Sequence, residues 1–318
     1  MPIGYRSLKD RDCFICVKFH HFLFFSILFI RVPMFNLNFT KNLTYALTIC
    51  YVPRMCLVVM AYKSWDHFPI VIAANRDEFF DRPASRAEFW SECPDLLAGR
   101  DLTSMGTWLG VTKQGRIGFV TNRRDFRETK LKSPISRGKL VENYLKTNLS
   151  PENFSKKIES ELQKYEGFNW YVGDLESAYC VSNRKNGTVS IEKGFHTLSN
   201  AYWDTRWPKT ERVLSLFTDI LETQKNKKSS DLPIESLFKM LNDGEQAPDQ
   251  FLPDTGIGAE KEKLLSSIRI SLPGYGTRVS TVLAISDLGE IFFYEKTFET
   301  PFSKDGEVAS YVFKLQGK

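Results

Sequence analysis

The order of strand-type and helix-type segments limits the folds open to this chain of 318 residues. From residue 55 onward, short apolar runs rich in β-branched residues stand near both ends, and helix-type segments stand between them. Because strands and helices do not alternate regularly, a layered sandwich of sheets and helices is favoured over a nucleotide-binding alternation. The predicted strand pairs are residues 56–62 with 69–74, 107–112 with 116–121, and 280–285 with 290–296.

Helix starts are marked by proline in the middle of the chain. Ser150-Pro151 predicts an N-cap followed by proline at the first helical position, with the helix ending near residue 164. Pro208 opens a second helix that carries an apolar stripe, and Pro233 opens a third that ends near residue 242. Strands are expected at 168–173 and 178–182, and exposed loops at 223–232 and 243–262. No G-x-G-x-x-G, P-loop, zinc signature or internal repeat occurs, so nucleotide chemistry has no support.

The net charge of +5 belongs to the beginning of the chain. Residues 1–54 hold seven of the 43 Lys and Arg residues and two of the 38 Asp and Glu residues, which leaves 36 of each sign downstream. A neutral domain has no electrostatic footprint for a polyanion, so nucleic acid is not an expected partner.

Residues 1–54 differ in character from the rest. The apolar run of residues 22–30 is too short for a membrane span, which needs about 20 residues. A small-residue cleavage site is missing after it. Cys13-x-x-Cys16 with His20 and His21 has metal-like spacing but no second ligand pair downstream. We expect 1–54 to be a leader, a targeting extension or an alternative start, and 55–318 to be the folded domain.

Three widely spaced cysteines follow residue 55, namely Cys56, Cys93 and Cys180. They make no disulfide framework, which indicates a reducing compartment and thus a cytoplasmic protein. Cys93-Pro94 resembles the short Cys-Pro pairs of some haem-responsive proteins, and a thiolate can ligate haem iron.

Four polar residues, Asn75-Arg76-Asp77-Glu78, follow a buried strand directly. Polar groups at a strand end are typical of a functional site, and a solvated turn is the alternative. The surrounding residues 73–84 resemble the signature of the NRDE family, which is named for these four residues and is the family of transport and Golgi organisation protein 2. Further matching motifs are Met55-Cys56-Leu57, Gly106-Thr-Trp-Leu-Gly110, Thr121-Asn122-Arg123, His196-Thr-Leu-Ser-Asn200, Asp204-Thr-Arg-Trp-Pro-Lys209 and Tyr275-Gly-Thr-Arg278.

The resemblance implies an α+β fold of the N-terminal nucleophile hydrolase type, a four-layer αββα sandwich with the reactive residue on the first strand. Cysteine hydrolases of this broad group use an N-terminal Cys, an Arg and an Asp soon after it, a later Asn and a late Arg. The corresponding catalytic candidates are Cys56, Arg76, Asp77, Asn200 and Arg278. Motif residues expected to line a ligand pocket are Asn75, Glu78, Trp108, Asn122 and His196.

The chemistry of an N-terminal cysteine explains why such residues would occur together in one site. A free α-amine has a pKa of about 7.7–8.0, so it can take the proton of its own thiol without a histidine. Arg76 would favour the thiolate, Asp77 would orient the amine, and Asn200 would donate to the oxyanion. Residues precede Cys56 in this chain, so the mechanism requires initiation at Met55 with Met removal, or cleavage after Met55.

Three functional classes stay open at this point. The resemblance implies roles in Golgi organisation and secretion, haem mobilisation and lipid homeostasis, and it leaves association with mitochondria or the Golgi open. The second class is an N-terminal cysteine amide hydrolase for a small acylated amide. The third is a non-catalytic module that binds a small hydrophobic ligand such as haem or a lipid. No cofactor is required in any of them, and haem enters only as cargo.

Overall fold

The structure is a computed structural model that describes residues 12–18, 27–33, 55–132, 134–184, 187–226, 231–303 and 305–316. The chain divides into two units, Met1–Val52 and Pro53–Lys318. In the first unit, β1 (Asp12–Lys18) pairs antiparallel with β2 (Ile27–Pro33). Of the metal-like motif, Cys13 and Cys16 lie on β1, and His20 and His21 lie outside the described residues.

Two antiparallel sheets form the centre of the second unit. One has the strand order β11-β10-β9-β8-β7-β6-β5, and the other has the order β12-β3-β4-β14-β15-β16, with β13 paired to β14. The first sheet consists of β5 (Ala84–Trp90), β6 (Cys93–Asp101), β7 (Leu109–Thr112), β8 (Ile117–Asn122), β9 (Phe168–Gly173), β10 (Ala178–Ser182) and β11 (Thr188–Ser190). The second consists of β3 (Met55–Trp65), β4 (Phe68–Phe79), β12 (Gly194–Leu198), β13 (Ser271–Leu272), β14 (Tyr275–Ile285), β15 (Glu290–Thr297) and β16 (Glu307–Lys314).

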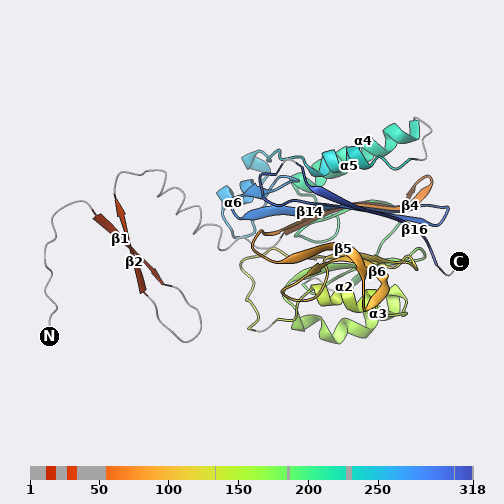
Figure 1. The fold of residues 1–318 in the computed structure, drawn as a ribbon, viewed down its shortest axis with the longest axis horizontal. Coiled ribbons are helices and arrows are strands. Elements are labelled where there is room, and N and C mark those ends of the chain that lie inside the picture. Colours follow the sequence, from red (N-terminus) through yellow and green to blue (C-terminus); the bar gives the residue numbers. More distant parts are fainter. Residues whose placement is uncertain are drawn as a thin grey trace. The chain divides into compact units, whose positions relative to one another are not determined.

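Helices cover the outer face of each sheet (Figure 1). On the first sheet lie α2 (Gly138–Leu145) and α3 (Pro151–Ile158), and on the second lie α4 (Pro208–Asn226) and α5 (Ile234–Leu241). Shorter helical turns are η1 (Glu159–Lys164), η2 (Asp249–Phe251) and α6 (Ala259–Leu264). The layer order helix, sheet, sheet, helix confirms the predicted four-layer αββα sandwich.

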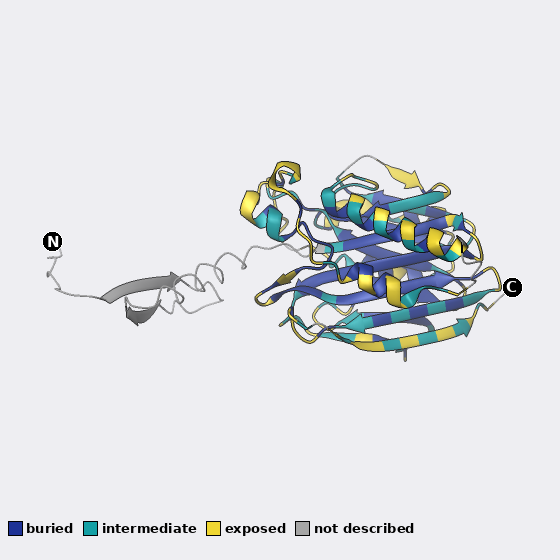
Figure 2. Ribbon diagram, turned by 90° about the horizontal axis from the view of Figure 1, so that it is seen from above, coloured by how far each residue is buried: buried dark blue, intermediate teal, exposed yellow. Residues whose placement is uncertain are grey.

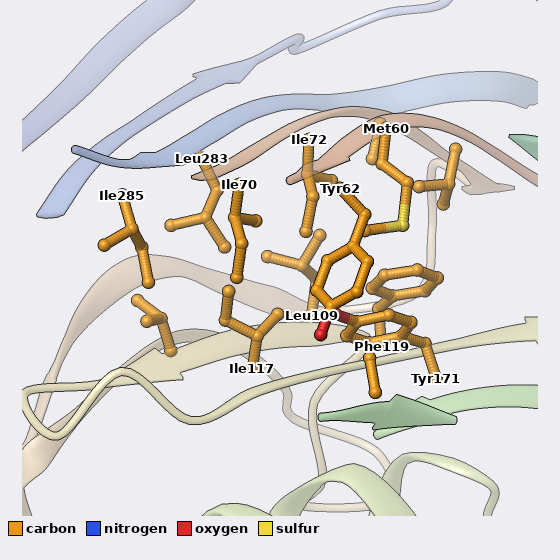
Figure 3. Close-up of a cluster of buried hydrophobic side chains, with 14 of the residues drawn as sticks. Met60, Tyr62, Ile70, Ile72, Leu109, Ile117, Phe119, Tyr171, Leu283 and Ile285 are labelled. Carbon is orange, nitrogen blue, oxygen red and sulfur yellow. The ribbon is translucent and has the colours of Figure 1, made fainter. Parts of the chain in front are cut away.

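The largest apolar core lies between the two sheets (Figure 3). Phe119 and Tyr171 stack there with ring centroids 4.5 Å apart, facing Met60 and Tyr62 of β3. The neighbouring β3 residues Leu57, Val59 and Ala61 point the other way and pack against α4. Since successive side chains of a strand alternate between faces, β3 is buried on both sides. The strands of both sheets are therefore mostly buried, and the outer faces of the helices are exposed (Figure 2).

Most of the predicted elements are confirmed. The hairpins β3–β4, β7–β8 and β14–β15 form as expected. The Ser150 side chain accepts a hydrogen bond from the backbone N–H of Asn153 at 3.2 Å, so it caps α3 as predicted. Beyond residue 158 the predicted helix continues as the 3₁₀ turn η1 rather than as α-helix.

Three sequence-based boundaries are wrong. β4 does not end at Ala74 but continues to Phe79, because residues 75–79 pair with β14 and part of the stretch with β3. The loop predicted to begin at residue 223 is still helix, since α4 continues to Asn226. The loop predicted over residues 243–262 contains η2 and the start of α6. Within the part of the chain that the structure describes, no helix has both the length and the apolar character needed to cross a bilayer.

The apolar core between the two sheets predicts which valine substitutions lower the stability of the domain. Val111 of β7 is fully buried between the sheets, and Val312 of β16 is 54% exposed. Both lose the same two methyl groups in a change to alanine. Val111→Ala should lower the free energy of unfolding by about 2 kcal/mol, because buried apolar surface and packing are lost.

Val312→Ala is the matched control and should change the free energy of unfolding by less than about 0.5 kcal/mol. Denaturant unfolding followed by circular dichroism measures both variants. Equal losses at the two positions would contradict the assignment of the core to the space between the sheets.

Candidate functional site

The four polar residues that end β4 alternate between its two faces. Asn75 points to the helix layer, where its Nδ2 donates to the carbonyl oxygens of Leu241 and Ile268 at 2.9 Å each. Its Oδ1 accepts a hydrogen bond from the Ser280 hydroxyl at 2.6 Å. Asn75 therefore ties β4 to β14 and to the segments around α5, and it does not line the main cavity.

A cavity of about 530 Å³ opens on the opposite face of β4, beside Cys56. Cys56 lies on β3 directly opposite Arg76 in the strand register, and its side chain is half-buried. Three of the predicted pocket residues, Glu78, Trp108 and Asn122, line this cavity together with Cys56, Arg76 and Asp77. The other lining residues are Arg82, Asp101, Ser104, Thr107, Val120, Pro134, Ile135, Ser136, Arg137, Gly138, Lys139 and Glu166.

Arg76 is the centre of a charged network in this cavity. Its Nη2 lies 3.5 Å from Glu78 Oε2 and 3.7 Å from Asp101 Oδ2, and its guanidinium stacks 4.3 Å from the Trp108 ring centroid. Arg76 Nη1 is buried and has no hydrogen-bond partner within the part of the chain that the structure describes. Burial lowers the pKa of Arg76, and the neighbouring carboxylates of Glu78 and Asp101 oppose that effect. The guanidinium stays charged, since its ordinary pKa is far above neutrality.

Arg82 and Asp101 complete the network, and the sequence interpretation did not select either of them. Arg82 Nε donates to Asp101 Oδ2 at 2.7 Å, and Arg82 Nη2 donates to Asp101 Oδ1 at 3.1 Å. This bidentate pair closes one wall of the cavity. Arg82 lies within the matched residues 73–84 and therefore carries a sequence signal, whereas Asp101, the last residue of β6, lies outside every motif of the sequence.

The Cys56 thiol is held in its protonated form. Burial raises its pKa to about 12, and the Asp77 carboxylate adds to that increase. Arg76 and the backbone N–H of Asp77 lower the pKa, but by less than burial raises it. The predicted effect of Arg76 on the thiolate has the expected sign, and desolvation outweighs it in the chain that retains the residues before Cys56.

Asp77 lies at the border between the cavity and the helix layer. Its Oδ1 accepts a hydrogen bond from the Thr277 hydroxyl at 2.6 Å, and its Oδ2 is buried with no hydrogen-bond partner in the described ranges. Burial raises the pKa of Asp77 to about 6, against the opposing effect of Lys209. In the strand register, Asp77 stands opposite Met55, the residue before Cys56.

Asn200 and Ser199 lie behind Cys56, outside the cavity lining. Asn200 Nδ2 donates to the carbonyl oxygen of Asn122 at 2.8 Å. The Ser199 hydroxyl is 3.0 Å from the carbonyl oxygen of Cys56 and 3.2 Å from Asn200 Oδ1. These residues fix the backbone around Cys56 and Asn122, and Asn122 is the asparagine that lines the cavity.

Neither Arg278 nor His196 is among the residues that line the cavity, and each makes hydrogen bonds to other parts of the domain. Arg278 Nη1 donates to the carbonyl oxygens of Phe79, at 3.3 Å, and of Arg82, so Arg278 fastens the turn that follows β4. His196 Nδ1 lies 2.8 Å from Asp204 Oδ2, and its Nε2 lies 2.9 Å from the carbonyl oxygen of Glu192. Catalytic roles for Arg278 and Asn200 stay predictions.

Among the described residues, no group of three or more His, Cys, Asp and Glu side chains could hold a metal ion. Cys93 pairs with Trp90 at the turn between β5 and β6 and packs against the core under α2 and α3. It is not among the residues that line the Cys56 cavity. Haem ligation by Cys93 stays a prediction.

Comparison with known proteins assigns the chain to a family. The family model "Transport and Golgi organisation 2" matches residues 55–300. The chain belongs to this family. The human transport and Golgi organization protein 2 homolog is 30% identical over 280 residues, which cover 82% of this chain and all of that protein. The Bos taurus homolog is 28% identical over 277 residues, and the Drosophila melanogaster protein is 23% identical over 253 residues, or 72% of this chain and 86% of its own length.

Among solved structures, a mutant of conjugated bile acid hydrolase from Clostridium perfringens is similar, with 9% identity and a TM-score of 0.44. The match covers 82% of this chain and 94% of that one. A second variant of the same hydrolase has a TM-score of 0.34, also at 9% identity. Since both scores are below 0.5, the fold assignment for this member of the Transport and Golgi organisation 2 family rests on its own four layers.

The raised pKa of Cys56 predicts low reactivity in the chain that retains residue 55. An unperturbed cysteine has a pKa of about 8.5, so at pH 8 the thiolate fraction of Cys56 should be lower by about three orders of magnitude. Iodoacetamide labelling of Cys56 in the folded chain should therefore be about a thousandfold slower than in the chain unfolded in guanidinium. The rate should still be rising at pH 10, because the thiol deprotonates only as pH approaches 12.

Peptide mass spectrometry identifies the labelled cysteine, and Cys56→Ser is the control for its assignment. Labelling of folded Cys56 at pH 8 within tenfold of the unfolded rate would show that burial does not protect the thiol.

Proposed function

We propose that this chain is an amide hydrolase whose nucleophile is Cys56 and whose general base is the α-amine of Cys56, available once the preceding residues are removed. The observation that supports it most is the position of the thiol. Cys56 faces a polar cavity beside Arg76 and beside the backbone N–H of Asp77, and no histidine is among the lining residues. A cysteine in such a place needs a base, and its own α-amine is the nearest group that a cleavage before residue 56 would create.

The reaction proceeds in two halves. The α-amine takes the thiol proton, and the thiolate sulfur forms a bond to the amide carbon of the substrate. The carbon–nitrogen bond then breaks, and the leaving amine receives the proton from the α-ammonium. In the second half, the α-amine takes a proton from water, and the hydroxide oxygen forms a bond to the thioester carbon. The carbon–sulfur bond then breaks, the α-ammonium returns its proton to the thiolate, and the carboxylic acid leaves.

The negative charge that develops on the carbonyl oxygen of the substrate has to be stabilised by hydrogen-bond donors in the cavity. Asn122 is one of the residues that line the cavity, and the hydrogen bond from Asn200 holds the Asn122 backbone in place. We assign oxyanion stabilisation to Asn122 and a supporting role to Asn200. Arg76 contributes its positive charge, since it lies opposite Cys56 and has a buried Nη1 without a partner.

The lining favours a small polar amide over haem or a lipid. Charged side chains of both signs line the cavity, and its large apolar contributions are Trp108, Val120, Pro134 and Ile135. A macrocycle or an acyl chain would leave many of these charges desolvated without partners. At the cellular level, we propose the role that the names of the relatives carry, transport and Golgi organisation, with amide hydrolysis as the molecular activity behind it.

One observation favours a second candidate, a binding module without turnover. In the chain that retains the residues before Cys56, the thiol pKa is raised to about 12 and no α-amine exists at Cys56. That form would bind an amide ligand beside Trp108 and would not acylate.

The experiment compares two forms of one purified protein. A variant of the full chain carries a protease recognition sequence that ends directly before Cys56, so that cutting after purification exposes the cysteine as the first residue. p-Nitrophenyl acetate supplies an activated acyl group, and mass spectrometry locates the acetyl adduct. The cut form should acylate at residue 56 faster by about 10²–10⁴-fold than the uncut form, because cutting supplies the general base.

Two variants control the assignment. Cys56→Ser should lose the fast acylation, and Cys180→Ser should keep it, since Cys180 is a buried core residue of β10. Equal rates for cut and uncut protein, or fast acylation at Cys93 or Cys180, would contradict the hydrolase proposal and favour the binding module.

A further inference from the structure

One buried ionisable group is not used in the proposed reaction. Lys209 is the second residue of α4, the residue is 3% exposed, and its Nζ has no hydrogen-bond partner among the described residues. No ion pair of Lys209 is found in the described part of the chain. A buried lysine without a partner is costly, because taking an ammonium group out of water costs several kcal/mol.

The position of Lys209 connects it with the start of β3. α4 packs on β3 and β12, and Lys209 interacts electrostatically with Asp77 of β4 and with Cys56 of β3. Asp77 Oδ2 is likewise buried without a hydrogen-bond partner among the described residues, and the strand register places Asp77 opposite Met55. Lys209 and Asp77 therefore interact electrostatically next to the start of β3 without a direct hydrogen bond within the described part of the chain.

The surrounding charges are already balanced. The titratable groups that act on Lys209 are Asp77, Cys56, Arg124 and Glu262, and Arg76 and Arg269 act on Asp77. Arg76 is balanced by the carboxylates of Glu78 and Asp101, which lie 3.5 Å and 3.7 Å from its Nη2. Arg124 Nη2 pairs with Glu262 Oε2 at 2.8 Å, which uses both charges. Arg269 donates to Asn242 Oδ1 and to the carbonyl oxygen of Ser303 at the edge of this region. Asp77 is thus the one carboxylate among these groups whose charge Lys209 can share.

We propose that Lys209 is a positioning residue that shares a single positive charge with the Cys56 α-amine across Asp77 and thereby keeps that amine neutral and able to take the thiol proton. The inference rests on the proposed function. When cutting exposes the α-amine, two amines stand near one buried carboxylate. One carboxylate balances one positive charge in a desolvated site, so the second amine has to be neutral.

The state of Lys209 in the intact chain supports this balance. Burial and, to a smaller extent, the Arg124 charge lower the pKa of Lys209 to about 7, against the opposing effect of Asp77. Two amines with pKa values near neutrality make the pair responsive to pH where the enzyme would work. When Lys209 is charged, it repels an α-ammonium group and so favours the neutral α-amine. When Lys209 is neutral, the α-amine can hold the proton.

The test measures the pH dependence of Cys56 acylation by p-nitrophenyl acetate in the cut full-length chain. The rate falls in acid as the α-amine becomes protonated. In the wild type, the midpoint of this fall should lie below the ordinary α-amine range of about 7.7–8.0. Lys209→Met removes the competing charge, so the midpoint should move to higher pH by about one unit. A midpoint that is the same in Lys209→Met and wild type would overturn the proposal.

Two further variants separate charge from packing. Lys209→Arg keeps a permanent positive charge, so its midpoint should lie at or below that of the wild type, and a shift upward would contradict the proposal. If circular dichroism shows that Lys209→Met does not fold, Lys209→Arg is the variant that tests the proposal. Lys225→Met removes an exposed lysine at the other end of α4 and should leave the midpoint unchanged.

Failure of the proposed function can be distinguished from failure of this inference. If cut wild type acylates quickly but Lys209→Met has the same profile, the hydrolase stands and the role of Lys209 falls. If no form acylates, the α-amine is titrated directly by NMR of the cut chain, produced with ¹³C- and ¹⁵N-labelled cysteine. A pKa in the ordinary α-amine range, unchanged by Lys209→Met, would overturn charge sharing, and a lowered pKa that rises in Lys209→Met would support it without turnover.

Discussion

The burial of four consecutive polar residues in the last part of β4 is the constraint on which the site depends. Asn75, Arg76, Asp77 and Glu78 are all at least nine-tenths buried, and each therefore needs partners inside the protein. The period of two in a strand divides their contacts between two faces. Asn75 and the Asp77–Thr277 pair hold β14 and the helix layer, while Arg76 and Glu78 form the charged wall of the cavity. The end of β4 thereby holds the neighbouring elements together and also positions the charged side chains of the cavity.

The site also depends on the protonation state of the Cys56 thiol. Cys56 faces the cavity where Arg76 and the Asp77 backbone favour a thiolate, yet burial raises the thiol pKa to about 12. In the proposed reaction, Cys56 is a nucleophile that has no base as long as residues precede it. A free α-amine near Asp77 would supply that base, and Lys209, a buried residue of α4 without a hydrogen-bond partner among the described residues, would set the charge of that amine.

Local patterns in the sequence predicted the hairpins, the Ser150 cap and the helix at Pro208, because turn chemistry and apolar periodicity act over a few residues. The same local view ended β4 at Ala74, since four polar residues read as a strand end when their partners on β14 are not known. For the same reason Asp101 carries no local signal, and Lys209, although it is the last residue of the matched motif 204–209, carries no local signal of its burial near Asp77. Their importance comes from burial against residues far away in the chain, and only the fold brings Asp101 to Arg82 or Lys209 near Asp77.

The central claim is that the Cys56 site acts in a chain that begins at Cys56. The most direct test is the intact mass of the protein purified from its own source, combined with N-terminal sequencing of the same sample. The account predicts a mass that corresponds to residues 56–318 and a first cycle that yields cysteine. A protein that acylates at Cys56 while its chain begins upstream of that residue would contradict it.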